Sequence, residues 1–265
     1  MAAQPLVRNS YREPIETFST NVMGTAHLLD ALRDLESVKA AVIATTDKVY
    51  RNNEWHWPYR EDDELGGYDP YSSSKAASEI VIGSYRDSFL KQQGVAVASA
   101  RAGNVIGGGD WSLDRLIPDA IRAWQEGKPI KIRRPNAIRP WQHVLEPLNG
   151  YLILAEKLCT NTSLEGAYNF GPLVEDAASV RDIIEMARNA YGNGLVDYDE
   201  ENQGPHEAGL LALDISKARQ TLGFKPRLTL ADSIQQTIDW YKAQFSGYDP
   251  RKLCDNEIAE YEASS

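Results

Sequence analysis

Two short apolar runs with a helical pattern between them constrain the fold of this chain more than any other feature. Residues 40–44 (Ala-Ala-Val-Ile-Ala) and residues 95–100 (Val-Ala-Val-Ala-Ser-Ala) each have the length and composition of a buried strand. Residues 70–92 lie between them and show helical spacing. Strand and helix signals alternate along most of the chain, which predicts an α/β fold rather than an all-α or all-β fold.

Polar residues follow the first apolar run, and a tyrosine and a lysine come later at helical spacing. Residues 45–48 (Thr-Thr-Asp-Lys) stand at the carboxyl end of the strand, where ligand sites occur in open α/β sheets. Tyr71 and Lys75 lie four residues apart, on one face of the helix. A neighbouring ammonium lowers the pKa of a tyrosine from its usual value near 10. The pair predicts proton abstraction from a substrate hydroxyl, accompanied by hydride transfer.

Four motifs occur in order along the chain. They are 44–50 (Ala-Thr-Thr-Asp-Lys-Val-Tyr), 66–75 (Gly-Gly-Tyr-Asp-Pro-Tyr-Ser-Ser-Ser-Lys), 101–111 (Arg-Ala-Gly-Asn-Val-Ile-Gly-Gly-Gly-Asp-Trp) and 139–144 (Arg-Pro-Trp-Gln-His-Val). Together they resemble the extended short-chain dehydrogenase/reductase superfamily and, within it, the CDP-glucose 4,6-dehydratases. The likeness extends from Ala2 to about Phe245. One Tyr-x-x-x-Lys motif would be weak evidence, whereas four ordered motifs are strong evidence.

The resemblance implies an NAD-dependent lyase that converts CDP-D-glucose to CDP-4-keto-6-deoxy-D-glucose in the deoxysugar biosynthesis that supplies lipopolysaccharide O-antigen. The catalytic residues that it implies are Thr46, Asp47, Lys48, Tyr71 and Lys75. The cofactor-binding residues that it implies are Ala2, Ala3, Thr45, Tyr71, Lys75 and Ala102. The substrate-binding residues that it implies are Asn104, Leu116, Arg134, Arg139 and His206.

The segment Thr46-Asp47-Lys48 allows more than one interpretation. Thr and Asp at a strand end also satisfy free backbone groups in ordinary turns. In a 4,6-dehydration, Asp47 suits the general acid if burial raises its pKa. Lys48 takes the C5 proton if desolvation leaves it neutral, or it stabilises the enolate as a cation. These two roles of Lys48 stay open.

The glycine-rich segment 103–109 and the arginines near residue 134 also have two interpretations each. Three consecutive glycines occur in tight or flexible loops, whereas the resemblance makes this loop a sugar-nucleotide contact through Asn104. Arg134 and Arg139 suit a pyrophosphate, because guanidinium forks match phosphate oxygens. Solvated loop arginines are the common alternative. The role of His206 depends on the resemblance alone.

Enzymes of this superfamily open with a glycine-rich G-x-x-G-x-x-G turn that receives the cofactor pyrophosphate, and no such motif precedes Thr46. We therefore expect a partial doubly wound, Rossmann-type parallel sheet that lacks its first mononucleotide-binding unit. Residues 1–106, joined by 140–171, would form this domain, and 107–245 mainly a smaller C-terminal substrate-binding lobe. The tail 246–265 shows little periodicity, so we expect it to fray or lie on the surface. An unpaired strand edge predicts low stability.

The net charge of −10 argues against nucleic acid or an anionic membrane surface as partners. No apolar run approaches the roughly 20 residues of a membrane span. Two cysteines without metal-like spacing favour a reducing cytoplasm, and no metal site is expected. Helices 13–35 and 70–92 have apolar residues on more than one side, which predicts a homodimer, or a dimer of dimers, through a four-helix bundle.

Two other functions remain open at the level of sequence. A sugar-nucleotide 4-epimerase also needs Thr46, Tyr71 and Lys75, but it has no use for an acid at Asp47. A non-catalytic sugar-nucleotide-binding fragment is the second alternative, and the missing glycine turn supports it. Tightly bound NAD in the purified protein would separate this second alternative from both enzymes.

Overall fold

The computed structural model describes residues 2–198 and 208–264, and these residues form two compact units. The first unit contains the described residues within 1–103, 148–171 and 206–225, and the second contains those within 104–147, 172–205 and 226–265. The chain leaves the first unit after Gly103, close to the boundary that we expected near residue 106.

The first unit contains a parallel sheet with the strand order β1-β2-β7. Strand β1 (Ala40–Ala44) pairs with β2 (Ala96–Ala102), which pairs in turn with β7 (Gly166–Phe170). Every residue of the central strand β2 is buried, whereas β1 is half-buried along its length. Small apolar residues suit a strand that is covered on both faces. The α/β class and the parallel sheet are therefore confirmed.

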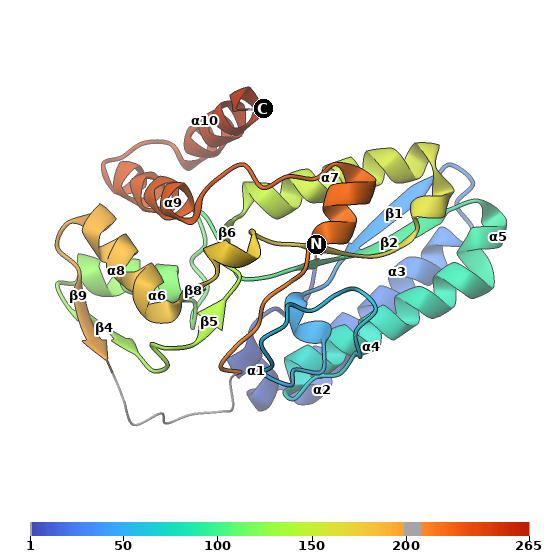
Figure 1. The fold of residues 1–265 in the computed structure, drawn as a ribbon, viewed down its shortest axis with the longest axis horizontal. Helices are drawn as coiled ribbons and strands as arrows, with labels where there is room; N and C mark the ends of the chain where they lie inside the picture. The colour runs from blue at the N-terminus through green and yellow to red at the C-terminus, as the bar shows by residue number, and fades with distance from the viewer. Residues whose placement is uncertain (1, 199–207, 265) are drawn as a thin grey trace. The chain divides into compact units, whose positions relative to one another are not determined.

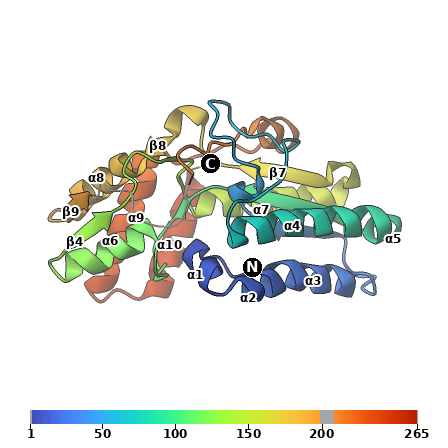
Figure 2. The same ribbon diagram turned by 90° about the horizontal axis from the view of Figure 1, so that it is seen from below.

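Helices cover both faces of this sheet. Helix α4 (Pro70–Tyr85) lies on one face and α7 (Leu145–Thr160) on the other (Figure 1), and α1 to α3 form a row along α4 (Figure 2). The other helical segments of this unit are α1 (Val7–Arg12), α2 (Pro14–Phe18), η1 (Ser19–Met23), α3 (Gly24–Leu32), η2 (Asp47–Val49), η3 (Arg86–Leu90), α5 (Lys91–Gln93), η4 (Thr162–Leu164) and η6 (Ala218–Leu222).

Residues 208–225 belong to the first unit, although we expected them in the C-terminal lobe. The backbone of Tyr59 donates a hydrogen bond to Ala212 (2.8 Å) and accepts one from Asp214 (2.9 Å). Leu211 and Leu213 pack into an apolar cluster with Val49, Tyr50 and Tyr59. This pairing joins segments about 150 residues apart, and no local sequence pattern indicates it.

The second unit is built around three amphipathic helices that enclose an aliphatic and aromatic core. Its elements are β3 (Val105–Ile106), α6 (Leu116–Gln125), β4 (Pro129–Ile132), β5 (Ile138–Arg139), β6 (Gln142–His143), η5 (Val174–Asp176), β8 (Ala178–Ser179), α8 (Val180–Tyr191), β9 (Leu195–Tyr198), α9 (Leu230–Phe245) and α10 (Pro250–Ala263). Helices α8 and α9 each begin with a capping box, at Ser179 and Thr229. Ile121, Ile184 and Ile238 lie fully buried at the centre of the core.

Helix α10 was not predicted, because the tail lacks apolar periodicity. Asp249 caps its first turn by accepting hydrogen bonds from two backbone N–H groups, and Pro250 occupies the first helical position. Near the other end, the Tyr261 hydroxyl donates to the buried Glu146 carboxylate at 3.0 Å. Glu146 also accepts from the backbone N–H groups of Arg227 and Leu228. The tail is therefore an ordered surface helix that one tyrosine anchors.

Candidate active site

The segment that follows β1 forms a short 3-10 turn that buries a carboxylate. Thr46 has an extended backbone and caps η2, because its hydroxyl accepts from the Lys48 N–H at 3.3 Å. The same hydroxyl donates to Asp47 Oδ1 at 3.0 Å. Thr46 and Asp47 are only 6% and 2% exposed. The interpretation of this segment as a capped turn is thus correct locally, and the turn also places Asp47 at the carboxyl end of the sheet.

Helix α4 begins with strong local signals that fix Tyr71 in its first turn. Asp69 caps the helix by accepting from the N–H and the hydroxyl of Ser72, and Pro70 occupies the first turn. The Tyr71 N–H donates to Ser10 Oγ at 3.1 Å, which ties the start of α4 to α1. Tyr71 is 8% exposed. Both its backbone position and its side chain are therefore held by the surrounding structure.

Lys75 connects α4 to the end of β1. Its Nζ donates to the Ala44 carbonyl oxygen at 3.1 Å, and η2 packs directly against α4. Burial lowers the pKa of Lys75, and the nearby Glu79 carboxylate acts against that shift. Thr46, Asp47, Lys48, Tyr71 and Lys75 therefore lie around one contact between α4 and the end of β1.

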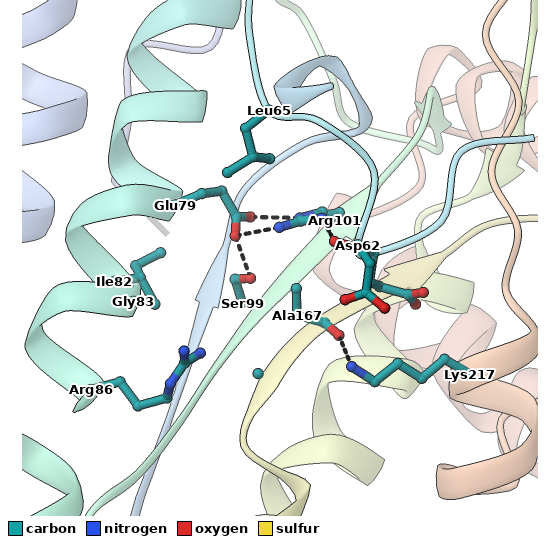
Figure 3. Close-up of a pocket in the computed structure, with 12 residues that line it drawn as sticks. Asp62, Leu65, Glu79, Ile82, Gly83, Arg86, Ser99, Arg101, Ala167 and Lys217 are labelled. Carbon is teal, nitrogen blue, oxygen red and sulfur yellow. Dashed lines mark hydrogen bonds and ion pairs between the residues drawn. The ribbon is translucent and has the colours of Figure 1, made fainter. Parts of the chain in front are cut away.

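A buried ion pair that the sequence did not predict lies one helical turn beyond Lys75. Glu79 accepts hydrogen bonds from Arg101 Nε at 3.0 Å and Nη2 at 2.9 Å and from Ser99 Oγ at 2.6 Å (Figure 3). It also accepts one from Thr45 Oγ1 at 2.5 Å. Both members of the pair are about 4% exposed. Thr45 was expected to bind cofactor, and here its hydroxyl is bonded to Glu79. The available sequence signal was a glutamate four residues after Lys75.

The ion pair forms part of the wall of a cavity of about 280 Å³ in the first unit. Arg86 and Lys217 contribute positive charge to this cavity, and Asp62 contributes negative charge (Figure 3). Glu61 also lines it. Tyr71 and Lys75 do not line it. The cavity is therefore separate from the contact that holds the candidate catalytic residues.

Tyr151 is a further residue near this contact that the sequence analysis missed. It lies on α7 and packs edge-on against Phe170, with ring centroids 5.4 Å apart. Burial raises the pKa of Tyr151, and electrostatic interaction with Tyr71 and Asp47 raises it further. Nothing in the apolar spacing of α7 distinguishes this tyrosine from a core residue, so no sequence signal could have identified it.

The other cofactor-binding candidates lie at strand ends or near the N-terminus. Ala102 is the last residue of β2 and is 8% exposed. Ala2 and Ala3 are exposed and precede Gln4, whose backbone N–H donates to Asn21 Oδ1 at 2.9 Å. The N-terminal segment is therefore attached to η1 from Gln4 onward.

The candidate substrate-binding residues lie in the second unit, apart from His206, which is outside the described residues. Arg139 is buried, and its Nη1 donates to the Ile138 carbonyl oxygen at 2.8 Å. Asn104 accepts a backbone hydrogen bond from Gln142 at 3.0 Å. Its buried side-chain Oδ1 has no hydrogen-bond partner within the described part of the chain.

Two further substrate candidates belong to the same unit. Leu116 is the first residue of α6 and is partly buried, and Arg134 is likewise partly buried in the connection between β4 and β5.

The triple glycine after β3 has a packing role. A Cβ on Gly108 would lie 2.1 Å from the Trp240 ring, and a Cβ on Gly107 would lie 2.7 Å from Val144. Gly109 has φ +80°, a conformation that favours glycine. Close approach to Val144 and to α9, together with a left-handed turn, therefore accounts for these glycines.

Among residues 2–198 and 208–264, no group of three or more His, Cys, Asp or Glu side chains is placed to hold a metal ion. No helix in this described part is both long and apolar enough to cross a membrane.

Comparison with known proteins places these features in a family. The family model described as GDP-mannose 4,6 dehydratase matches residues 1–237. The CDP-glucose 4,6-dehydratase of Salmonella typhimurium (strain LT2) is 48% identical over 267 residues, which is 98% of this chain and 74% of the relative.

Solved structures share the fold. The UDP-glucuronic acid 4-epimerase of Bacillus cereus, in complex with UDP-glucuronic acid and NAD, superposes with a TM-score of 0.80 at 23% identity and covers 92% of this chain and 74% of its own. The dTDP-glucose 4,6-dehydratase of Bacillus anthracis, in complex with NAD, has a TM-score of 0.75 at 23% identity and covers 91% of this chain and 73% of its own.

Proposed function

Because the chain belongs to the GDP-mannose 4,6-dehydratase family, a part of the extended short-chain dehydrogenases/reductases, we propose that it is an NAD-dependent 4,6-dehydratase of CDP-D-glucose. The product would be CDP-4-keto-6-deoxy-D-glucose and one water. The observation that carries this proposal is the buried Asp47 carboxylate beside the start of α4, since a dehydration needs an acid there and an epimerisation does not. The 48% identity to a CDP-glucose 4,6-dehydratase supports the choice of nucleotide.

The residues of this contact divide the proposed reaction between them. Tyr71, whose ionised form the Lys75 ammonium favours, removes the proton of the C4 hydroxyl with help from Thr46. The resulting ketone acidifies the proton at C5. Asp47 then protonates the C6 hydroxyl as it leaves as water, while Lys48 accepts the C5 proton or stabilises the enolate. A bound NAD would supply the acceptor for the C4 hydride and its donor at C6, and C5 would regain a proton from Lys48 or solvent, so the sugar undergoes no net oxidation.

The residues at the strand ends fit such a cofactor. Among the described residues, Ala44 is the one hydrogen-bond acceptor of the Lys75 ammonium, so two of its three donors are available for ribose hydroxyls. Thr45 and Ala102 mark the carboxyl ends of β1 and β2, the edge at which nucleotides bind in open α/β sheets. Ala2 and Ala3 remain candidates for the same cofactor, because both are exposed.

The nucleotide of the substrate would be held by the second unit. We infer this role for Asn104, Leu116, Arg134 and Arg139, with His206 included by resemblance. The buried Asn104 Oδ1 without a partner supports it, since such a group favours a ligand donor.

The proposal is tested in deuterated water with CDP-D-glucose and NAD. We expect product that carries solvent deuterium at C5, and mass spectrometry should detect bound NAD. Asp47→Asn should slow turnover by about 10²–10⁴-fold and accumulate reduced cofactor, whereas Asp30→Asn, at an exposed carboxylate on α3, should react normally.

Each alternative function has its own signature in this experiment. Unchanged turnover in Asp47→Asn, or an unlabelled C5, would favour a 4-epimerase. Failure to bind NAD while still binding the nucleotide sugar would favour a non-catalytic binding protein.

We further infer a homodimer, or a dimer of dimers, through the outer faces of α2, α3 and α4. Ile15 on α2 is 81% exposed, Leu28 on α3 51% and Ile80 on α4 65%, and a second copy of these helices would cover them. Light scattering at micromolar concentration should give a dimer mass. Ile80→Glu should lower that mass, and a monomeric parent protein would contradict the inference.

We infer a cytoplasmic location as well. Cys159 and Cys254 are both free thiols, which agrees with a reducing compartment. Fractionation of the source cells should recover the protein with cytoplasmic markers.

A further inference from the structure

The surroundings of Lys75 disfavour its positive charge. The side chain is 8% exposed, and burial disfavours a charged ammonium. One backbone carbonyl, that of Ala44, accepts a hydrogen bond from it. A single neutral acceptor is little compensation for the water that this group has lost. A nearby negative charge would keep the lysine charged, and Glu79 provides one on the next turn of the same helix.

Glu79 is held as a carboxylate by four hydrogen bonds. Oε1 accepts from Thr45 and from Arg101 Nε, and Oε2 accepts from Ser99 and from Arg101 Nη2. Burial alone would raise the pKa of Glu79, but Arg101 and the two hydroxyls lower it below its ordinary value. The carboxylate is therefore a fixed negative charge at neutral pH.

Arg101 is itself fixed from two further directions. Its Nη1 donates to the Tyr50 hydroxyl at 3.0 Å and to the Glu61 backbone oxygen at 2.9 Å. The Tyr50 hydroxyl donates to Asn169 Oδ1 at 2.6 Å. These bonds extend from β2 to β7, so the position of Glu79 is determined by the sheet as well as by its own helix.

The charged groups around this face of α4 can be named element by element. Helix α4 contributes Tyr71 and Glu79, η2 contributes Asp47 and Lys48, and β2 contributes Arg101. α1 and η1 form hydrogen bonds with α4 through the neutral side chains of Ser10 and Asn21. Of these groups, Glu79 is the one that opposes the effect of burial on Lys75.

We propose that Glu79 is a positioning residue: its buried carboxylate keeps the Lys75 ammonium charged, and its bond to Thr45 holds the strand end that leads into Thr46 and Asp47. The consequence of Glu79 for catalysis rests on the proposed dehydratase function, but the effect of Glu79 on the charge of Lys75 does not. Glu79 acts through Lys75 and Thr45 and lines the separate cavity of Figure 3, so it contacts neither substrate nor cofactor in this role.

Removal of the Glu79 charge and entry of water would shift the pKa of Lys75 in opposite directions, which makes the proposal testable. In Glu79→Gln, loss of the negative charge in an intact structure should lower the pKa of Lys75 below its value in the parent protein. If Glu79 only supported local packing, its loss would admit water and raise that pKa toward its ordinary value. Side-chain NMR of protein labelled with ¹³C-lysine, titrated with pH and assigned with Lys75→Arg, measures this shift directly.

Two further variants complete the test. Glu61→Gln removes a partly buried carboxylate from a residue that contacts Arg101 and should leave the Lys75 titration unchanged. Glu79→Gln/Arg101→Gln removes both charges, so it avoids a buried, uncompensated guanidinium if the single variant fails to fold. The double variant should still shift Lys75 downward. An unchanged or raised pKa in a folded variant would overturn the proposal.

The outcome can be told apart from a failure of the proposed function. The lysine titration needs neither NAD nor a sugar nucleotide, whereas the function is tested by deuterium at C5. If the role of Glu79 and the dehydratase function are both correct, the high-pH limb of kcat/KM should move to lower pH in the double variant, because turnover requires charged Lys75. The same limb should stay in place in Glu61→Gln.

Discussion

The first unit buries a cluster of charged side chains beside its sheet, whereas the main core of the second unit consists of aliphatic and aromatic side chains. In the first unit, β2 and α4 bury Arg101, Glu79 and Lys75 close to the carboxyl edge of the sheet. In the second unit, the core around α6, α8 and α9 contains isoleucines and three tryptophans, and the buried Glu146 carboxylate accepts three hydrogen bonds. Buried ion pairs are weak sources of stability, whereas buried aliphatic groups are strong ones.

The difference between the two interiors indicates that the two units have different roles. A polar interior fixes charges near the strand end at the cost of stability, as expected for a site that moves protons. An apolar interior provides a rigid support. The two interiors should therefore respond differently to substitution, and four experiments examine that difference.

The largest effect is expected for Arg101→Met in the first unit. It leaves the Glu79 carboxylate buried without its ion-pair partner, which typically costs about 3–5 kcal/mol. Glu79→Gln added to Arg101→Met should recover part of this loss, because no unpaired charge then remains. Urea unfolding followed by circular dichroism measures both variants. Additive losses would show that the pair is not coupled.

Next in size is the pH dependence that His143 gives to the second unit. Its imidazole is fully buried, and burial lowers its pKa to about 4 from an ordinary value near 6.5. Between these values the unfolded chain binds more protons, so stability should fall as the pH drops from about 6.5 to about 4, by on the order of 3 kcal/mol.

The Leu145 N–H donates a hydrogen bond to His143 Nδ1 at 3.4 Å. His143→Asn keeps an acceptor for this N–H and should remove the dependence of stability on pH. Glu257 titrates in the same range with the opposite sign, since burial and Glu260 raise its pKa to about 7. The difference between variant and parent isolates His143. Parallel stability curves for the two proteins would contradict the assignment.

A smaller effect is expected for Tyr261→Phe, which removes the hydroxyl that donates to Glu146. A hydrogen bond to a charged group contributes about 1.5–3 kcal/mol. Because this bond anchors α10, hydrogen exchange should accelerate in 250–263 more than in α9. Tyr248→Phe, at an exposed tyrosine, is the control and should leave exchange unchanged.

The smallest effect is expected for Ile121→Val in the apolar core. Loss of one buried methylene typically costs about 0.5–1.5 kcal/mol, and Ile121 is fully buried. Turnover should not change, because this core has no part in the proposed chemistry. If Ile121→Val lowered the free energy of unfolding as much as Arg101→Met, the contrast between the two units would be wrong.

The sequence predicted elements well wherever the signal was local. Strand 40–44 has the bounds expected from its apolar run, and the helix expected at 70–92 begins at the Asp69 cap and continues through η3 and α5 to Gln93. Both depend on composition, periodicity or capping within a few residues. The pairs β3–β6 and β5–β8 were missed, because two-residue strands are too short to show a period.

The candidate site was predicted only where a motif was contiguous. Tyr71 and Lys75 were found because both lie on one helix. Glu79 and Arg101 were missed because they are 22 positions apart, and each resembles an ordinary charged surface residue in its own segment. Tyr151 carries no local signal at all. Predicting these three requires knowledge of the tertiary structure.

The contact between Gly108 and Trp240 has a consequence for synthesis of the chain. These residues are 132 positions apart. Because ribosomes add about 5–20 residues per second, Trp240 is synthesised roughly 7–26 s after Gly108. Glu146 and Tyr261 are 115 positions apart, which gives a delay of roughly 6–23 s. The core of the second unit is therefore completed only after α9 has been synthesised, and until then the apolar faces of α6 and α8 that contact α9 stay uncovered.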